Sequence, residues 1–126
     1  LHKEYRRQRQ MCIRDSTHSV ESTVLSDHFK EQAKIQLEGW EMLKGLKRIT
    51  SHETSIDIPI VPNNQNIKEL SQTVRPYLSS TLPGILVAGH GLYAWGNSLE
   101  EAQRHVEILE FLFSVLLQKI LLESNS

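Results

Sequence analysis

Residues 85–96 read ILVAGHGLYAWG, and this stretch decides the fold expected for the chain. The opening apolar run is typical of a buried β-strand, and residues 89–95 are expected to turn and continue as a second strand. In the turn, His90 stands between two glycines, which let other backbone approach closely and leave the imidazole unobstructed. On spacing alone, a structural histidine is favoured over a ligand-binding one.

The segment that follows predicts the longest helix of the chain. Residues 98–101, SLEE, fit a capping box, in which the serine accepts from the first turn and a glutamate reaches back. The helix is expected to run to about residue 122. Its second half, residues 108–122, is apolar on nearly every side, which is typical of a helix buried all round. We therefore expect a subunit interface, or a part of the protein outside this sequence, to cover it.

Upstream, short helices and strands alternate. Polar–apolar alternation predicts strands at residues 34–37 and 55–61, and Pro59 favours an edge position for the second of them. Helices are expected over residues 18–30, where Ser19 or Ser22 could cap the first turn, over 40–46, and over 66–78, where apolar residues recur every three or four positions. This alternation indicates a layered α/β domain.

The composition argues against nucleic-acid and membrane partners and against sites built from several cysteines. The 126 residues carry 14 Lys and Arg against 15 Asp and Glu, so no basic stripe predicts nucleic-acid binding. No apolar run approaches the length that crosses a bilayer, so no membrane partner is expected. Cys12 is the single cysteine, which excludes an intrachain disulfide and a thiolate zinc cluster and fits a cytoplasmic location.

The first sixteen residues are predicted to be foreign to the domain and disordered. Residues 6–16, RRQRQMCIRDS, resemble a translated sequencing adapter, the transposon end used in library preparation, and residues 1–5 are expected to share that chimeric origin. A genuine basic arm is the alternative. Without residues 1–16, nine Lys and Arg stand against thirteen Asp and Glu, a net charge of −4. The domain is therefore assigned to residues 17–126 and is expected to lack its N-terminal part.

The remaining histidines could do chemistry or be structural. A divalent cation such as zinc needs three or four nitrogen and oxygen ligands at one point, and His90 is well framed for that task. His18 opens the domain ahead of a Ser/Thr-rich helix. His28 and His52 are expected on the surface, with His52 beside Glu53 as a weaker candidate near a site. His105 is expected to be solvated among the charged residues of the long helix. Two aromatic residues after His90 share one strand face and could be core or line a pocket: Tyr93 and Trp95.

Three segments together resemble the class II aldolase/adducin family. Residues 89–112, GHGLYAWGNSLEEAQRHVEILEFL, are similar to the segment that precedes and begins the last long helix of that family. Residues 17–25, THSVESTVL, resemble the end of its His-Thr-His-Ser metal motif, and residues 40–45, WEMLKG, resemble its Glu-Met-(Ile/Leu)-Lys-Gly segment. The resemblance implies a layered α/β/α domain with a mainly antiparallel central sheet.

The resemblance also implies roles for individual residues. His18 and His90 correspond to metal ligands, and Glu41 corresponds to the catalytic acid/base. The implied cofactor is one divalent cation per subunit, Zn²⁺ by expectation, although three-histidine sites accept other metals. The first ligand would stand at position 16, which is Ser16 here. The chain as given is therefore expected to lack a ligand and the upstream phosphate-binding residues, and to be inactive by itself.

The Tyr-x-Trp-Gly detail favours a dehydratase of the family over its sugar-phosphate aldolases. The implied reaction is loss of water from 5-methylthioribulose 1-phosphate, a small-molecule sugar phosphate of methionine salvage, by a homo-oligomer, a tetramer by expectation. Two alternatives stay open. One is a class II sugar-phosphate aldolase or epimerase, and the other is a non-catalytic, adducin-like interaction domain.

Overall fold

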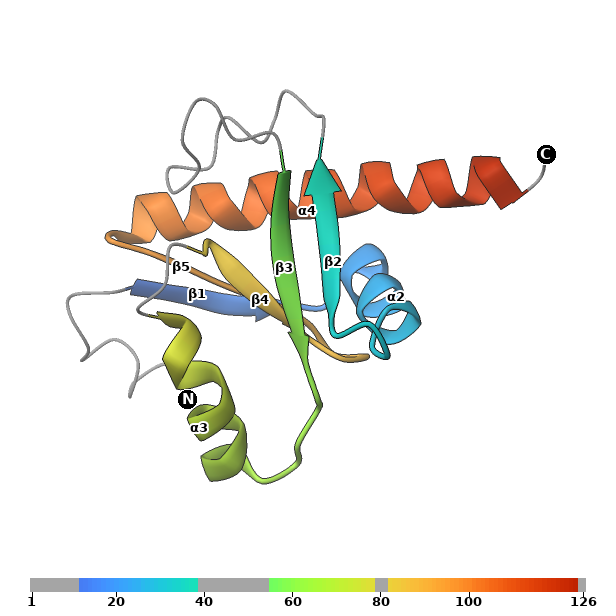
Figure 1. Cartoon of the computed structure of the whole chain (residues 1–126). Helices are drawn as coiled ribbons and strands as arrows, with labels where there is room; N and C mark the ends of the chain where they lie inside the picture. The colour runs from blue at the N-terminus through green and yellow to red at the C-terminus, as the bar shows by residue number, and fades with distance from the viewer. Residues whose placement is uncertain (1–11, 39–54, 79–81, 125–126) are drawn as a thin grey trace.

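A five-stranded sheet forms the centre of the protein (Figure 1). The computed structural model describes residues 12–38, 55–78 and 82–124. Across the sheet the strands follow the order β1-β5-β4-β3-β2. Their bounds are Cys12–Thr17 for β1, Lys34–Glu38 for β2, Ser55–Val61 for β3, Gly84–Val87 for β4 and Gly91–Gly96 for β5.

Three of the four strand pairings are antiparallel, namely β1 with β5, β5 with β4 and β3 with β2. The pairing of β3 with β4 is parallel, with Ile60 opposite Leu86 and Val61 opposite Val87. A parallel pair needs a crossover connection, and the helix α3 (Ile67–Leu78) lies in it. The sheet is thus mixed, and the expectation of a mainly antiparallel sheet is confirmed.

Helices cover both faces of the sheet. The helices α2 (Val20–His28) and α4 (Leu99–Ser124) lie against one face, where Leu25 and Leu109 join the larger apolar core with Ile58 and Leu92. The helix α3 packs through its apolar stripe on the other face, against a smaller core that contains Trp95. These three layers confirm the α/β/α architecture.

The position of Pro59 differs from the expectation, because β3 lies between β4 and β2 and is not an edge strand. The amide of Ile60 donates to Ala33 O on the β2 side at 2.8 Å. Amide directions alternate along a strand, so the nitrogen of Pro59 faces the β4 side. Pairing with β4 begins only at Ile60, so the missing donor of Pro59 costs the ladder no hydrogen bond.

Residues 12–16, which the sequence predicted to be disordered, belong with Thr17 to the edge strand β1. Cys12 stands opposite Gly96, Ile13 opposite Trp95 and Arg14 opposite Ala94. An edge strand in an antiparallel pair is held mainly by backbone hydrogen bonds. A segment whose apolar residues do not alternate regularly can therefore still complete a sheet. Residues 1–11 lie outside the described part of the chain.

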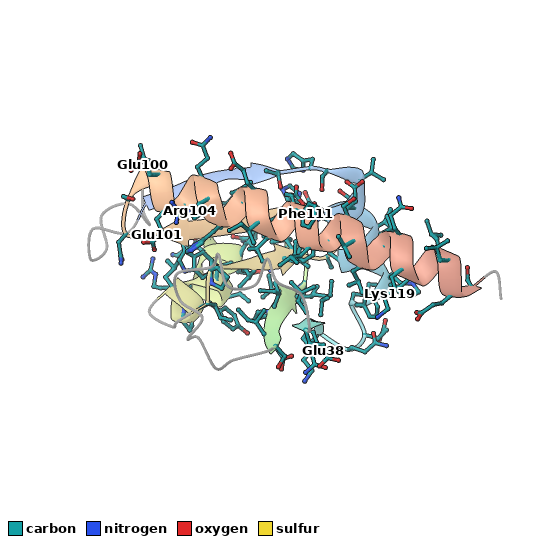
Figure 2. The ribbon with its side chains drawn as sticks, turned by 90° about the horizontal axis from the view of Figure 1, so that it is seen from above. Glu38, Glu100, Glu101, Arg104, Phe111 and Lys119 are labelled. Atoms are coloured by element: carbon teal, nitrogen blue, oxygen red, sulfur yellow. The ribbon has the colours of Figure 1, made fainter. Side chains whose placement is uncertain are left out.

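The helix α4 is the longest element and begins with the expected cap. The amide of Glu101 donates to Ser98 Oγ at 3.0 Å, and Glu101 Oε1 in return accepts from the amide of Asn97 at 3.2 Å. Figure 2 looks down on this helix, with Glu100 and Glu101 at its start, Phe111 near its middle and Lys119 toward its end.

The far half of α4 is apolar but incompletely covered. Phe111 is 51% exposed, Leu121 50% and Leu122 72%. Beside them lies a shallow hollow of about 430 Å³, lined by Phe111, Ser114, Val115, Gln118, Lys119 and Leu122. Its covering by another subunit or by more of the protein stays a prediction. None of the helices in the described ranges combines the length and apolar character that crossing a membrane requires.

Candidate metal centre

His18 and His90 lie together although they are 72 positions apart in the sequence. Their ring centroids are 4.5 Å apart and the rings meet edge to face. His18 follows the last residue of β1 and precedes the N-cap of α2, whereas His90 lies in the turn between β4 and β5. The pairing of β1 with β5 brings both segments to the same end of the sheet.

The two glycines beside His90 allow this approach for different reasons. Gly89 has φ +66°, in the left-handed region that the tight turn requires. Gly91 has φ +145°, and a Cβ atom added there would lie 1.9 Å from Thr17 O. Only glycine therefore lets the backbone before His18 pass directly against the turn that carries His90, as the sequence pattern predicted.

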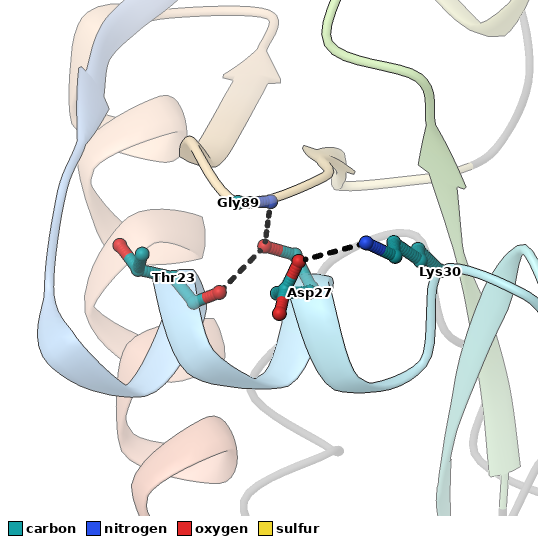
Figure 3. A network of polar contacts seen from close by, with 5 residues as sticks. Thr23, Asp27, Lys30 and Gly89 are labelled. Carbon is teal, nitrogen blue, oxygen red and sulfur yellow. Dashed lines mark hydrogen bonds and ion pairs between the residues drawn. The ribbon is translucent and has the colours of Figure 1, made fainter.

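The turn is also tied to α2 (Figure 3). The amide of Gly89 donates to Ser26 Oγ at 3.0 Å, and the hydroxyl of Ser26 donates to Thr23 O at 3.1 Å. Ser26 is fully buried, so this hydrogen bond is shielded from water. At the exposed end of the same helix, Asp27 forms an ion pair at 3.2 Å with Lys30, which lies just after the helix.

The hydrogen bond of His18 determines which of its nitrogens can bind a cation. His18 Nδ1 lies 2.9 Å from His90 O, and a carbonyl oxygen only accepts. Nδ1 therefore carries the proton, and in the neutral ring Nε2 keeps its lone pair. Metal-binding histidines commonly donate their other ring N–H to a backbone carbonyl, so this arrangement fits a ligand. Among the described residues, no third His, Cys, Asp or Glu joins the pair in a metal-binding cluster.

Tyr93 stands next to His90 and not simply in the core. Its ring stacks on the imidazole at 5.9 Å, and its hydroxyl lies 3.4 Å from His90 Nε2. Burial, and secondly the neighbouring His18 ring, lower the pKa of His90 below its ordinary value of 6.5. A lowered pKa keeps the imidazole neutral at pH 7, and the neutral form is the one that binds metal.

The other predicted residues fall into three groups. Trp95 is fully buried in the core beneath α3. His105 is also fully buried, which contradicts the expectation of a solvated residue, and its Nδ1 lies 2.7 Å from Trp95 O. His28 is exposed as expected, at the end of α2. The proposed catalytic residue Glu41, the residues 40–46 expected to form a helix, and His52 with Glu53 lie outside the described residues.

Sequence reasoning missed Glu110, which contacts the segment that carries His18. Its carboxylate accepts from Thr17 Oγ1 at 2.6 Å and from Ser19 Oγ at 2.9 Å. A signal was present in the sequence, because Glu110 is the only charged residue in the apolar run of residues 108–117. A lone carboxylate in such a run indicates a specific polar partner.

A hollow of about 420 Å³ lies beside the turn that carries His90. Ala88 lines it from the turn, Asp27 from α2 and Lys30 from the turn after α2, and residues 60–63 line it from the end of β3 and the segment that follows. The hollow thus combines apolar walls with an ion pair, as small-molecule sites commonly do, and it reaches the turn of His90 through Ala88, although neither histidine lines it.

Comparison with known proteins agrees with this geometry. A sequence model described as the Class II Aldolase and Adducin N-terminal domain matches residues 5–117. The chain therefore belongs to the class II aldolase/adducin family, as its motifs indicated. The match includes much of the segment that was expected to be foreign.

Three curated relatives within this family share one name and are similar to most of this chain. Methylthioribulose-1-phosphate dehydratases are 46% identical over 97% of this chain in Pectobacterium carotovorum, 45% over 81% in Parvibaculum lavamentivorans and 49% over 86% in Yersinia enterocolitica. The match covers 60%, 51% and 52% of those proteins, respectively, so the chain spans between half and three fifths of their length.

A solved structure shares the fold. YgbL from Escherichia coli, described as a candidate aldolase/epimerase/decarboxylase, superposes with a TM-score of 0.64 at 22% identity. The match covers 90% of this chain and 51% of YgbL. At that identity the similarity concerns the fold alone, and it agrees with the class II aldolase-like architecture.

Proposed function

We propose that the chain is part of an enzyme that dehydrates 5-methylthioribulose 1-phosphate to 2,3-diketo-5-methylthiopentyl 1-phosphate, a lyase step of methionine salvage. The observation that carries the proposal is the close pair of His18 and His90, with Nδ1 of His18 committed to a carbonyl and Nε2 left for a ligand. The proposed reaction follows the names of the relatives, which are methylthioribulose-1-phosphate dehydratases 45–49% identical to this chain.

The two imidazoles would hold one divalent cation, which we propose is Zn²⁺. When bound, such a cation stabilises negative charge that develops on a substrate carbonyl oxygen. Neutral imidazole ligands leave the positive charge of the ion undiminished, which suits that task. Gly91 and Ser26 keep the two ligand-bearing segments in contact.

The proton transfer is assigned to Glu41. A carboxylate can take the proton next to the carbonyl and return a proton to the leaving hydroxyl, so that one water is lost in balance. The hollow beside Ala88, in the turn that precedes His90, offers space for part of a small substrate. The relatives support this substrate class, since their names specify a sugar phosphate.

The test is a chimaera in which residues 17–126 replace the matching part of the Pectobacterium carotovorum relative. We expect it to bind Zn²⁺ and to convert 5-methylthioribulose 1-phosphate into the diketone, followed by its absorbance. His18→Ala and His90→Ala should lose both properties, whereas Glu41→Gln should keep the metal and lose turnover. Release of an aldehyde would indicate an aldolase, inversion of one carbon an epimerase, and a metal-free, inert protein an adducin-like interaction domain.

We further propose a cytoplasmic homotetramer. The exposed apolar side chains of Phe111, Leu121 and Leu122 on α4 support association between subunits. A single cysteine supports a reducing compartment. Light scattering of the purified chimaera would measure the subunit number.

A further inference from the structure

We propose that Glu110 is the positioning residue of the His18 ligand, an inference that rests on the proposed metal site. Its carboxylate reaches across from α4 and holds the residues on both sides of His18, namely Thr17 and Ser19. The side chain of His18 is exposed, and among the described residues it makes one hydrogen bond, to His90 O. The orientation of its ring therefore depends on how firmly its backbone is held.

The two contacts differ in what they fix. Thr17 ends β1, so the 2.6 Å bond from its hydroxyl to Glu110 Oε2 anchors the exit from the strand. Ser19 is the N-cap of α2 and accepts the amide of Ser22 at 3.0 Å, so the 2.9 Å bond to Glu110 Oε1 anchors the start of the helix. A carboxylate is the suitable bridge because it accepts at both oxygens.

The surroundings of Glu110 strengthen this bridge. Hydrogen bonds to an ionised acceptor are roughly twice as strong as neutral ones. The carboxylate also lies at the N-terminus of α2, where the helix dipole favours negative charge. Glu110 is partly buried on a helix that packs against the sheet, so the bridge connects the exposed His18 segment to the core.

The test compares Glu110→Ala, Glu110→Gln and the control Glu107→Gln, which alters an exposed carboxylate of the same helix that contacts Gln103. In the chain without metal, nitrogen–proton spectra of the imidazoles report the tautomer of His18. We expect the Nδ1–H form in the parent and the control, a shift toward the free-imidazole mixture in Glu110→Ala, and substantial recovery in Glu110→Gln, whose amide can still bridge both hydroxyls.

A Zn²⁺ titration provides the second readout. Loss of a direct hydrogen-bond partner of a metal ligand typically weakens affinity about 10–100-fold. Glu110 contacts the two residues that flank His18, so we expect a loss near the lower end of that range in Glu110→Ala and none in Glu107→Gln. Thr17→Val, which keeps the shape and removes one hydroxyl, should give a smaller loss and should add little to Glu110→Ala. Circular dichroism checks that each variant folds, and Thr17→Val carries the test if Glu110→Ala does not fold.

The two readouts separate the two proposals. An unchanged His18 tautomer in folded Glu110→Ala, or in Thr17→Val if only that variant folds, would overturn the role of Glu110. Measurable Zn²⁺ binding of equal affinity in the parent and the variant would do the same. If the parent bound no Zn²⁺ while the tautomer responded as described, the positioning role would stand and the metal function would fail.

Discussion

Thr17 and Gly91 are in contact through their backbones, and a single methyl group on Gly91 would lie 1.9 Å from Thr17 O. This contact lets the chain before His18 pass over the turn that contains His90. The candidate site thus depends on a residue that has no side chain of its own.

Gly91→Ala tests this dependence directly. The added Cβ clashes with backbone, and φ +145° is strained for any L side chain, so we expect a loss of stability of about 1–3 kcal/mol. The contact between the His18 and His90 rings should weaken at the same time, measured as a nuclear Overhauser effect. Gly89→Asn is the control, because asparagine tolerates φ +66° and the nearest atom is 3.9 Å away. Equal loss in both variants would contradict the role of the close approach.

His105→Ala should be among the most damaging histidine substitutions in the described part of the chain. The residue is fully buried, and its Nδ1 contacts Trp95 O, so truncation leaves a cavity and a buried carbonyl without this donor. We expect a loss of about 2–4 kcal/mol in urea unfolding. His28→Ala, on an exposed residue, should change stability by less than about 0.5 kcal/mol. A similarly small change for His105→Ala would show that the buried His105 side chain contributes little to the free energy of unfolding.

The lowered pKa of His90 predicts a pH dependence of folding. Below the ordinary value of 6.5, the unfolded chain binds the proton more tightly than the folded one does. The metal-free protein should therefore lose stability as pH falls from 6.5 through the folded pKa, and regain it as pH rises. Urea midpoints between pH 5 and 8 would measure this, with His90→Gln expected to flatten that part of the curve. A steeper curve in His90→Gln would contradict the prediction.

Ser16→His should raise the affinity of this chain for Zn²⁺, because position 16 is where the family resemblance expects the first ligand. Two imidazoles hold a cation weakly, and a third completes the smallest common protein ligand set. Isothermal titration of the parent, Ser16→His and Ser16→Ala would measure the gain. Equal affinities in all three would contradict the alignment of this segment with the metal motif.

Phe111→Glu should reduce association while leaving the fold intact. The Phe111 side chain is 51% exposed beside an apolar hollow. The introduced carboxylate should therefore destabilise the monomer little, whereas its burial in an apolar interface would strongly weaken association. Sedimentation velocity would report the change, with Arg104→Glu as an exposed control on the same helix. A parent chain that is monomeric at all concentrations would contradict the proposed oligomer.

Much of the fold could be read from the sequence because periodicity reports which face is buried. The apolar stripe of α3 and the continuous run of β4 both appeared where the pattern placed them. The pattern was misread at His105, which follows Ala102 by three positions and precedes Leu109 by four, and so shares their buried face. Its charged neighbours on the sequence lie on other faces of the helix.

Other features could not be read because they depend on contacts between distant segments. The strand pairing of residues 12–16 and the interior position of Pro59 follow from the sheet order, which no local pattern contains. The candidate site shows the same division. The two glycines that flank His90 could be recognised from the local sequence. The hydrogen bond between Glu110 and Thr17 could not, because it joins residues 93 positions apart.

Phe111 follows Glu110 on α4. The residue expected at a subunit contact is therefore the neighbour of the residue that is proposed to position His18. A subunit that docked on this stretch, as proposed, would restrict its motion, and a cation held at His18 would restrict it from the other side. Under thermodynamic linkage, each event then favours the other by the same factor. Dilution that dissociates the assembly would accordingly also release metal.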